Sequence, residues 1–591
     1  MTKRTIALDW ESFYDDECTI TKLGNRGYYN HPKFDAYLLS AVSDDGIRWV
    51  GHPQDFDWSL IEGAHVLSHN ASFDEGLYLE LVRKGHYPLV AYAAWDCTLD
   101  LCSYHGIRRS LKNAVKDLFD VELSKETRDN MQGFDWATMT PEFRKEVEEY
   151  ALMDAEWCLK VWQRLSDTWP EHERRISRHT RIMCRRGIAV DEATLRKSIE
   201  DMGTIKFELE SGIPWTEHAK LKSRKAFDEE CRKHGLTPPK SLAKNDPAAE
   251  AWFDEHEKNH TWLSCYRNVG RANTFHLKLQ NLEKQIFNGR YYPSINYFGA
   301  HTGRFSSGGG SENENASGIN LQNLPKKPMF GVNFRELFVA GPGKKFVVVD
   351  LAQIEVRTTL WLAGDKEALA EIARTDDLYE ALAIMFGLWD RDRGPLRTGD
   401  PELRQGTKTI GLGVQFGASA GKVAQIGGIP LEEAERWVGL FRDKFPKVRK
   451  LWDRLVAAVT KGRTSPDRTC VFKMPDGTEL KYRNIRYEGG SLVCKVLKGR
   501  GYADMRPWHG VLVENAAQKL ARNVMCDAIL RIEEAGYPVV LHVHDEVVIE
   551  VDADRAEQCL ADVLAIMKTA PSWIPDLPLD AEGHVCGKYT K

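Results

Sequence analysis

The chain has 591 residues, a formal net charge of −5, and hydrophobic and charged fractions of 42% and 28%. This length is too great for one hydrophobic core and predicts three or four domains, while the composition is that of an ordinary globular protein. The net negative charge counts mildly against a non-specific DNA binder without excluding local basic grooves, and no segment has the roughly eighteen consecutive apolar residues of a membrane span.

The twelve cysteines are scattered without a CxxC pair. This distribution indicates reduced thiols in a cytoplasmic protein and counts against a zinc site or a disulfide framework. The first residues, MTKRTIALDWES, contain no apolar signal region, and acidic residues occur early. We therefore expect a cytoplasmic location and no membrane association.

Residues 5–8 form a short apolar run that leads directly into Asp9 and Glu11. Side chains alternate along a strand, so two carboxylates spaced by two residues point to the same face. Farther on, residues 64–67 predict a strand, and the helix that follows is expected to carry Asp74 in its first turn.

A helical periodicity runs through residues 146–162, where Tyr150 and Asp154 are four positions apart and share one face. Asp96 and Asp100 lie nearby and match no pattern, so we expect them at the surface or at a helix cap. Because these acidic residues are far apart in sequence, only the fold could bring a set of them together.

In these acidic positions the chain resembles the DEDD exonuclease family. The resemblance implies a ribonuclease H-like α/β domain over residues 1–168, with two bound metal ions and with Tyr150 orienting the attacking water. Two cations would neutralise the anionic phosphodiester and loosen a proton of the water. A degenerate nuclease fold kept as scaffold is the alternative. The three matching motifs are Asp9-Trp10-Glu11, Asn70-Ala71-Ser72-Phe73-Asp74 and Tyr150-x-x-x-Asp154, and the implied metal ligands are Asp9, Glu11, Asp74 and Asp154.

The segment 169–289 is helical in pattern and rich in charge. Lysine and arginine alternate with apolar residues at helical spacing, which predicts either solvated helix faces or helices that hold phosphates without reading sequence. The polar stretch 241–260, which contains Pro247, predicts a loop or a helical tip. Residues 302–325 are rich in glycine and serine and predict a flexible loop, although Arg304 and Gln322 stand there among small residues that let a backbone approach closely.

Three consecutive valines precede Asp350 and predict a buried strand that ends at a carboxylate. Residues 537–551 predict two further strands with a tight turn at His544-Asp545-Glu546. A charge at the end of a buried strand is costly unless a cation receives it, and hard divalent ions prefer oxygen ligands. Asp350 and Asp545 are therefore candidate ligands of a metal pair for phosphoryl transfer; the alternative is two acidic turns beside core strands.

In the stretch 404–417, Arg404, Lys408, Leu412 and Phe416 are spaced by four. On a helix this spacing makes one stripe that is cationic at one end and aromatic at the other. A nucleoside triphosphate requires that profile, with cations for the phosphates and a flat apolar surface for the base. Glycines lower the helix propensity by about 1 kcal/mol each, which suits an element that moves; a surface helix with a core-facing Phe is the alternative.

Over its C-terminal half the chain resembles family A DNA polymerases, the bacterial polymerase I type. The family's primer–template segment and its motifs A, B and C occur in the expected order and spacing. The matching positions are Thr302-Gly303-Arg304 with Ser306-Ser307 and residues 320–325, Asp350 to Arg357, Arg404 with Lys408, Phe416 and Gly417, and Val543-His544-Asp545-Glu546.

The resemblance implies roles for these residues. Asp350 and Asp545, with Glu546 beside them, form the catalytic site and hold two Mg²⁺ ions, for which Mn²⁺ can substitute. Glu355 lies under the sugar of the incoming deoxynucleoside triphosphate and, with Phe416, excludes a 2′-hydroxyl. The other implied nucleotide-binding residues are Arg404, Lys408, Leu412 and Gln353, and the implied primer–template contacts are Arg304, Gln322, His544 and, as a looser match, Gln518.

Three places depart from the family pattern. Leu351-Ala352 stand where motif A usually has Tyr-Ser, Leu412 replaces an aromatic of motif B, and Glu514 replaces an Asn that usually precedes Gln518. The metal ligands are unchanged, so the departures concern nucleotide discrimination and fidelity. Because the chain starts directly with the exonuclease-like region, we expect no 5′-nuclease domain and a closer likeness to a bacteriophage replicative enzyme than to a bacterial repair polymerase.

We therefore expect an α/β exonuclease domain (1–168), a helical linker and thumb (169–292), and an α+β right-hand polymerase region of palm and fingers (293–591, with fingers at about 360–460). The expected activity is template-directed DNA synthesis with 3′–5′ proofreading in phage DNA replication, in the cytoplasm of a bacterial host. The expected partners are primer–template DNA, deoxynucleoside triphosphates and a processivity factor or helicase.

Two alternatives stay open. One is a stand-alone 3′–5′ exonuclease or RNA-processing nuclease whose C-terminal half only binds substrate. The other is a non-enzymatic DNA-binding scaffold, which the intact acidic positions disfavour.

Overall fold

The computed structural model describes residues 4–124, 126–216, 219–243, 246–307, 319–375, 377–499 and 501–590, except the side chains of Ile410 and Leu412. Of the loop predicted at 302–325, residues 308–318 lie outside the described residues. The chain divides into two compact units. The first contains Met1–Gly187, Tyr292–Gln322 and Ala340–Gly587, and the second contains Ile188–Tyr291, Asn323–Val339 and Lys588–Lys591.

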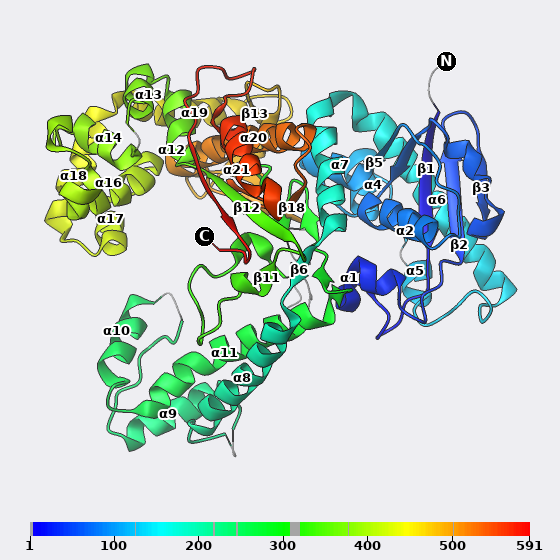
Figure 1. Ribbon diagram of the computed structural model, residues 1–591, viewed down its shortest axis with the longest axis horizontal. Coiled ribbons are helices and arrows are strands. Elements are labelled where there is room, and N and C mark those ends of the chain that lie inside the picture. Colours follow the sequence, from blue (N-terminus) through cyan, green and yellow to red (C-terminus); the bar gives the residue numbers. More distant parts are fainter. Residues whose placement is uncertain are drawn as a thin grey trace. The chain divides into compact units, whose positions relative to one another are not determined.

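A five-stranded mixed sheet forms the N-terminal part of the first unit (Figure 1, blue). Its strands, in the order β3-β2-β1-β4-β5, are β1 (Thr5–Glu11), β2 (Leu38–Ser43), β3 (Arg48–Gly51), β4 (His65–Ser68) and β5 (Ala94–Cys97). β1 is antiparallel to β2 and parallel to β4. Ile6 and Leu8 are fully buried in the core under the sheet, so the strand is anchored by its apolar residues and presents Asp9 and Glu11 near its carboxyl end.

Helices surround this sheet and carry the other acidic positions. α6 (Pro141–Leu165) packs against β1 and β2, and α2 (Ala71–Arg83) packs against β4 and β5. The predicted strand before α2 and the place of Asp74 in the first turn of α2 are confirmed. The remaining helices of this region are α1 (Ile20–Tyr29), α3 (Thr98–Tyr104), α4 (Leu111–Phe119), α5 (Glu126–Asn130) and α7 (Glu171–Arg186).

A second, fully antiparallel sheet contains the three consecutive valines. Its strands, in the order β17-β18-β12-β19, are β12 (Lys344–Leu351), β17 (Val539–Val543), β18 (Glu546–Asp552) and β19 (Ala581–Cys586). Val347 and Val349 are fully buried, which confirms the predicted buried strand. The turn between β17 and β18 contains only His544 and Asp545, because Glu546 already pairs with Asp350 in the ladder.

A group of helices follows β12 and is drawn in green and yellow in Figure 1. Its longer members are α12 (Ile354–Ala363), α13 (Lys366–Ala373), α14 (Leu378–Met385), α16 (Pro401–Gly413), α17 (Ala420–Gly427), α18 (Leu431–Lys444) and α19 (Pro446–Gly462). The helix predicted to extend through Phe416 ends at Gly413, and Val414–Phe416 form a 3₁₀ turn. Gly417 has a φ of 77° and closes that turn, as a glycine in the left-handed region commonly does. Phe416 therefore lies beyond the helix, and the prediction that Arg404, Lys408, Leu412 and Phe416 form one stripe on a single helix is wrong at Phe416.

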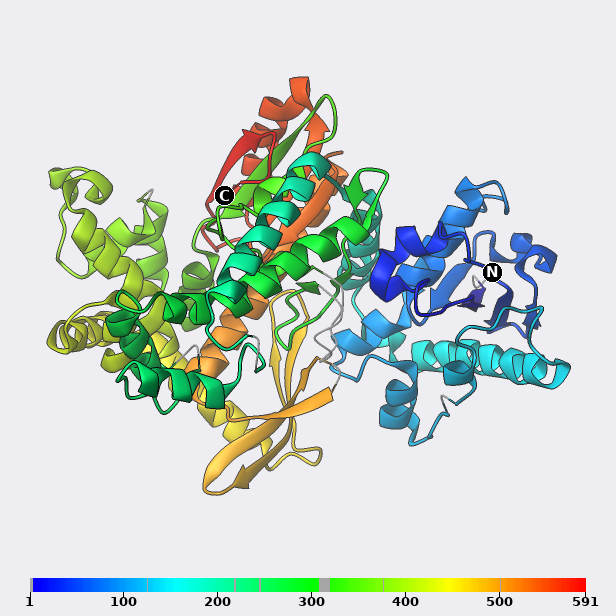
Figure 2. The same ribbon diagram turned by 90° about the horizontal axis from the view of Figure 1, so that it is seen from below.

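A four-stranded antiparallel meander precedes the long helix α20 (His509–Glu534), and Figure 2 shows its strands in orange. The strands are β13 (Cys470–Lys473), β14 (Glu479–Glu488), β15 (Ser491–Lys498) and β16 (Gly501–Met505). α20 packs against α12 and α19, and α21 (Ala556–Lys568) packs on β12 and β19. The β12 sheet is thereby tied to the helices that follow it in the chain.

The second unit contains two long helices, α8 (Glu192–Ser211) and α11 (Thr261–Lys284), which lie side by side (Figures 1 and 2). α9 (Arg224–Lys233) and α10 (Pro247–His256) lie between them in sequence. The polar stretch predicted as a loop or helical tip is helical in α10, because Asp246 caps the helix and Pro247 occupies its first turn. Among the residues that the structure describes, no helix is at once long and apolar enough to cross a membrane.

Candidate functional site

Four acidic side chains from three elements gather at one end of the N-terminal sheet. Asp9 and Glu11 lie on β1, Asp74 lies in the first turn of α2, and Asp154 lies in α6. They are close enough for the charges of the other three to act on Asp9. The fold therefore brings together the four acids that the sequence leaves far apart.

Burial and mutual repulsion disfavour the charged forms of these carboxyl groups. Burial, followed by the charges of Glu11 and Asp154, raises the pKa of Asp9 well above its usual value. Burial and the Asp154 charge raise the pKa of Glu11 to about 8, and burial raises the pKa of Asp74 to about 8. A set of oxygen donors that repel one another fits hard divalent cations, which would take the place of the protons.

Tyr150 and Arg128 border this cluster. The Tyr150 hydroxyl forms a hydrogen bond with Asp154, and burial together with the Asp154 charge raises the pKa of the phenol, which therefore remains a donor. The charge of Arg128, on α5, opposes the rise in the pKa of Asp9 and Glu11. Sequence reasoning missed Arg128, because a lone arginine in a short polar helix carries no pattern of its own.

Asp96 and Asp100 were expected at the surface or at a helix cap, and neither lies at the surface, although Asp100 is in the first turn of α3. Asp96 is fully buried and accepts a hydrogen bond of 2.7 Å from Nε of Arg178. Asp100 is also buried and accepts a hydrogen bond of 2.7 Å from the Ser177 hydroxyl. Both partners belong to α7, so these acids join that helix to the N-terminal sheet.

Asp350 and Asp545 meet through the pairing of β12 with β18. Asp350 pairs in register with Glu546, and the Leu351 amide donates a hydrogen bond of 2.9 Å to the carbonyl of Asp545. Both aspartates are half-buried, whereas Glu546 is buried. Adjacent strands thus offer two carboxylates at one end of the sheet, a donor type that hard divalent ions prefer.

Gln322 holds the turn that contains Asp545. Its Nε2 donates a hydrogen bond of 2.8 Å to the carbonyl of His542, and the His544 amide donates one of 3.3 Å to its Oε1. Gln322 is buried at this point. The structure therefore brings Gln322 and His544 to the same place as Asp545.

Charged side chains also gather at the start of α12. Arg304 forms an ion pair with Glu355, which lies in the first turn of that helix. Gln518 donates a hydrogen bond of 3.0 Å to Glu514, and burial followed by the Glu355 charge raises the pKa of Glu514. The glutamate that departs from the family pattern thus adds a second carboxyl group close to Glu355.

The structure places the residues predicted to bind the triphosphate on and beyond α16 in different environments. Arg404 forms an ion pair with Asp377 and lies over the Tyr379 ring at 5.1 Å from its centroid. Lys408, one turn farther on, is exposed, and Phe416 is half-buried beyond the helix end. The side chain of Leu412 lies outside the described residues. Gln353 is half-buried before α12, with a φ of 46°.

Known proteins resemble this chain over most of its length. The chain is 30% identical over 460 residues to a protein named "DNA polymerase I, thermostable" from Thermus filiformis, an alignment that covers 75% of this chain and 51% of the relative. It is 23% identical over 674 aligned positions to the DNA polymerase of Bacillus phage SP02, and this alignment covers 100% of both chains. The chain therefore spans about half the length of the Thermus relative.

A solved structure shares the fold. The POL domain of Pol1 from M. smegmatis, in complex with DNA primer-template and dNTP, superposes with a TM-score of 0.71 at 19% identity, over 100% of this chain and 96% of that chain. Residues 217–591 match the family model described as DNA polymerase family A. This match covers more than half of the chain and confirms the resemblance seen in the C-terminal motifs: the chain belongs to DNA polymerase family A.

Proposed function

We propose that the protein is a template-directed DNA polymerase that extends a primer 3′ end and also digests 3′ ends at a separate site. The observation that carries this proposal is the presence of two separate oxygen-donor sites in one chain of this family: Asp350 with Asp545, and the four acids around Asp9. In support, the Thermus and phage relatives are named DNA polymerases, and the M. smegmatis domain was solved with primer-template and dNTP.

In the polymerase site, Asp350 and Asp545, with Glu546 beside them, would hold two Mg²⁺ ions, which supply charge neutralisation at the triphosphate. Arg404 and Lys408 bind its phosphates. The primer 3′-hydroxyl attacks the α-phosphate in line, and pyrophosphate leaves.

The other assigned residues select and position the substrates. Glu355, with Phe416, faces the sugar and excludes a 2′-hydroxyl. Gln353 and Leu412 complete the nucleotide pocket. The primer–template contacts are assigned to Arg304, Gln322, His544 and Gln518.

In the second site, Asp9, Glu11, Asp74 and Asp154 would hold a second pair of divalent ions, which neutralise the phosphodiester. The Tyr150 hydroxyl, already hydrogen-bonded to Asp154, orients the attacking water. A mispaired 3′ end would be digested at this site, and the corrected end would then be extended at the polymerase site, which constitutes proofreading.

We assign the exonuclease domain to residues 1–168, the linker and thumb to 169–292, and palm and fingers to 293–591. The end-to-end alignment with the Bacillus phage SP02 polymerase supports a role in phage DNA replication. A processivity factor or helicase is the expected partner beyond DNA and nucleotides.

A primer-extension assay tests this proposal. With Mg²⁺ and a labelled primer–template, the protein should lengthen the primer when deoxynucleotides are present, shorten it when they are absent, and do neither in excess EDTA. Shortening without any lengthening would instead identify a stand-alone exonuclease. Binding without either reaction would identify a DNA-binding scaffold.

A further inference from the structure

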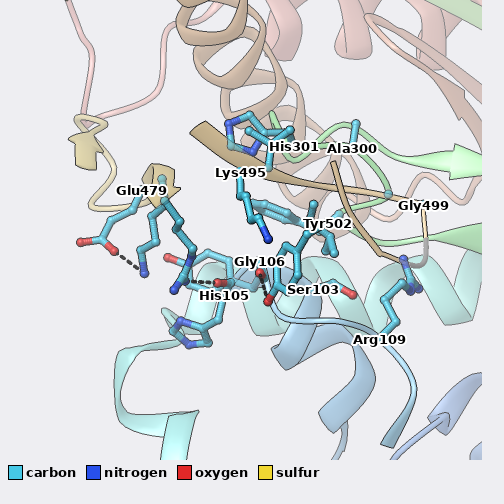
Figure 3. A pocket seen from close by; sticks show the side chains of 17 residues that line it. Ser103, His105, Gly106, Arg109, Ala300, His301, Glu479, Lys495, Gly499 and Tyr502 are labelled. Atoms are coloured by element: carbon cyan, nitrogen blue, oxygen red, sulfur yellow. Dashed lines mark hydrogen bonds and ion pairs between the residues drawn. The ribbon is translucent and has the colours of Figure 1, made fainter. Parts of the chain in front are cut away.

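A concave site that is lined by none of the predicted site residues lies in the first unit (Figure 3). Its walls are residues 103–109 at and after the end of α3, the loop 298–301, and strands β14, β15 and β16. The space measures about 570 Å³, part of it open to solvent. The enclosed part is much smaller than the roughly 300–1,000 Å³ of common ligand pockets, so the site suits a small group such as a phosphate rather than a whole nucleotide.

The lining is strongly basic in a protein whose net charge is negative. It contains four cationic side chains and one carboxylate: Arg109, Lys481, Arg483, Lys495 and Glu479. Glu479 pairs with Lys481 at 2.8 Å. The other three cations form no salt bridge within the part of the chain that the structure describes, although the charge of the buried Asp100 acts on Arg109.

Two of these cations are held in place by neutral acceptors. Arg109 donates to the carbonyl of Tyr297 at 3.3 Å and to the Asn296 side chain at 3.2 Å. Arg483 donates to the carbonyl of His105 at 2.6 Å. These bonds fix the guanidinium groups without neutralising them. Lys495 is exposed, and Figure 3 shows its amino group directed toward the pocket wall at Gly106.

The neighbouring histidines reflect the same positive environment. Burial, followed by the charge of Lys481, lowers the pKa of His105 to about 4. Burial, followed by the charges of Lys519 and Arg483, lowers the pKa of His301 to about 4. The Nε2 atom of His301 is buried and has no hydrogen-bond partner among the described residues, so a neutral imidazole with an unused polar atom lines the pocket.

Aromatic rings complete the lining. Phe298 packs against Tyr104 with ring centroids 5.5 Å apart, and the ammonium of Lys519 lies 4.4 Å from the Phe298 centroid. Tyr502, at the opposite wall, is partly exposed and donates a hydrogen bond of 3.3 Å to the Gly106 carbonyl. Phe298 and Tyr104 are buried, and Lys519, which covers the Phe298 ring, is buried too, so of these three rings Tyr502 is the one exposed to a base that could stack on it.

Two elements of the pocket wall are linked to the regions that carry the carboxylate sites. The Arg109 carbonyl accepts a hydrogen bond of 2.8 Å from His69, which directly precedes the cap of α2, the helix that carries Asp74. In the other direction, the loop 298–301 leads to Arg304, the partner of Glu355.

We propose that this basic pocket binds the phosphate of a nucleotide, presented either by single-stranded DNA or by a free nucleotide. The inference rests on the proposed function, because an enzyme that extends and digests DNA encounters both. Lys495 is its most direct probe, since it lines the pocket and makes no ion pair with a described residue.

The test compares Lys495→Glu with Lys498→Glu in the full chain. Lys498 lies on the same strand, is also exposed, and does not line the pocket, so it controls for the change in net charge. Binding of a labelled oligothymidylate and of dTMP is measured in EDTA, where no digestion occurs, at a series of salt concentrations.

Lys495→Glu should weaken binding about tenfold in the oligothymidylate arm, the dTMP arm or both, and should lower the salt slope for the oligonucleotide by about 0.7 for each lost phosphate contact. Lys498→Glu should change binding by less than about twofold. An effect confined to dTMP identifies a free nucleotide as the occupant. Equal affinities for the two variants in both arms overturn the proposal.

These outcomes are separable from those of the proposed function. If the wild-type protein neither extends nor digests a primer while Lys495→Glu still loses oligonucleotide affinity, the enzymatic proposal fails and the binding site stands. If both reactions proceed and the two lysine variants bind alike, the enzyme stands and the pocket has a different role.

Discussion

The two carboxylate sites are built in different ways. The acids around Asp9 come from a strand and two helices that are remote in sequence, and they are close enough to raise one another's pKa. Asp350 and Asp545 lie at the ends of strands that pair directly in one sheet, joined by the backbone hydrogen bond from Leu351. One site is assembled by tertiary packing and the other by strand pairing.

This difference predicts that the two sites respond differently to the removal of cations and to substitution of their acidic residues. A site whose acids repel one another is unstable without cations and depends on the helices that hold it. A site set by a β-ladder keeps its geometry through the backbone, so substituting a ligand removes chemistry while the fold remains. The following experiments test that contrast.

The largest effect is expected at the strand-paired site. Asp350→Ala or Asp545→Ala removes a metal ligand and should lower primer extension at least about a thousandfold, which corresponds to about 4 kcal/mol of lost charge stabilisation. Digestion of single strands should continue. The control is Asp552→Ala, an exposed residue on β18 that pairs with Lys344. Extension by either variant at the control rate would refute the assignment.

The second-largest effect is expected at the four acids around Asp9. Asp9→Ala combined with Glu11→Ala should reduce digestion of a single-stranded 3′ end at least about a hundredfold, because both β1 ligands are lost. Extension should persist with more misincorporated nucleotides in the product. Exposed Glu17→Ala is the matched control. A double variant that shortens primers as fast as wild type contradicts the nuclease assignment.

The contrast also explains what the sequence could predict. The strand before Asp350 was predictable because a run of β-branched residues identifies a buried strand locally, and the turn before Glu546 is equally local. The approach of Asp9 and Asp154 was expected only through the resemblance, since periodicity describes each element and not the way elements pack. The role assignments at both sites remain predictions.

The misses share one physical reason. Asp96 was expected at the surface, yet its partner Arg178 lies 82 residues away and no local pattern connects them. The assignment of Arg404 to the triphosphate remains a prediction, but its ion pair with Asp377, 27 residues earlier, was likewise not foreseen. Charged residues default to the surface in sequence reasoning, so buried or shared ion pairs are the class it overlooks.

A moderate effect is expected in the pH dependence of stability. The pKa of Glu11 and of Asp74 is raised to about 8 in the folded chain, whereas carboxyl groups of an unfolded chain titrate near about 4. Between these values the folded state binds more protons than the unfolded state, so stability falls as pH rises from about 4 to about 8.

Thermal unfolding in EDTA at pH 5 and pH 8 measures this effect. Glu11→Gln should reduce the drop in Tm across this range by at least about 3 °C relative to wild type, and Mg²⁺ should reduce the wild-type drop, because the ion replaces the protons. Glu17→Gln serves as control. A wild-type drop that neither Mg²⁺ nor Glu11→Gln changes would show that repulsion in the cluster does not govern stability.

The smallest effect is expected where α16 meets Asp377. The ion pair with Asp377 occupies the guanidinium of Arg404, so an incoming triphosphate must compete with a carboxylate for that cation. Asp377→Asn removes the negative charge but keeps a side-chain oxygen that can accept the hydrogen bond from the Tyr379 amide at the cap of α14.

This substitution should therefore lower the KM for deoxynucleotides about threefold with little change in kcat, since the competing charge is lost before the nucleotide binds. Asp390→Asn is the matched control, because Asp390 also caps a short helix and is exposed. If the KM rises instead, Asp377 orients Arg404 toward the phosphates rather than competing with them. In that case the polymerase site around Asp350 depends on a carboxylate from a neighbouring helix, as the site around Asp9 does. The two sites would then differ less than the contrast between strand pairing and helix packing suggests.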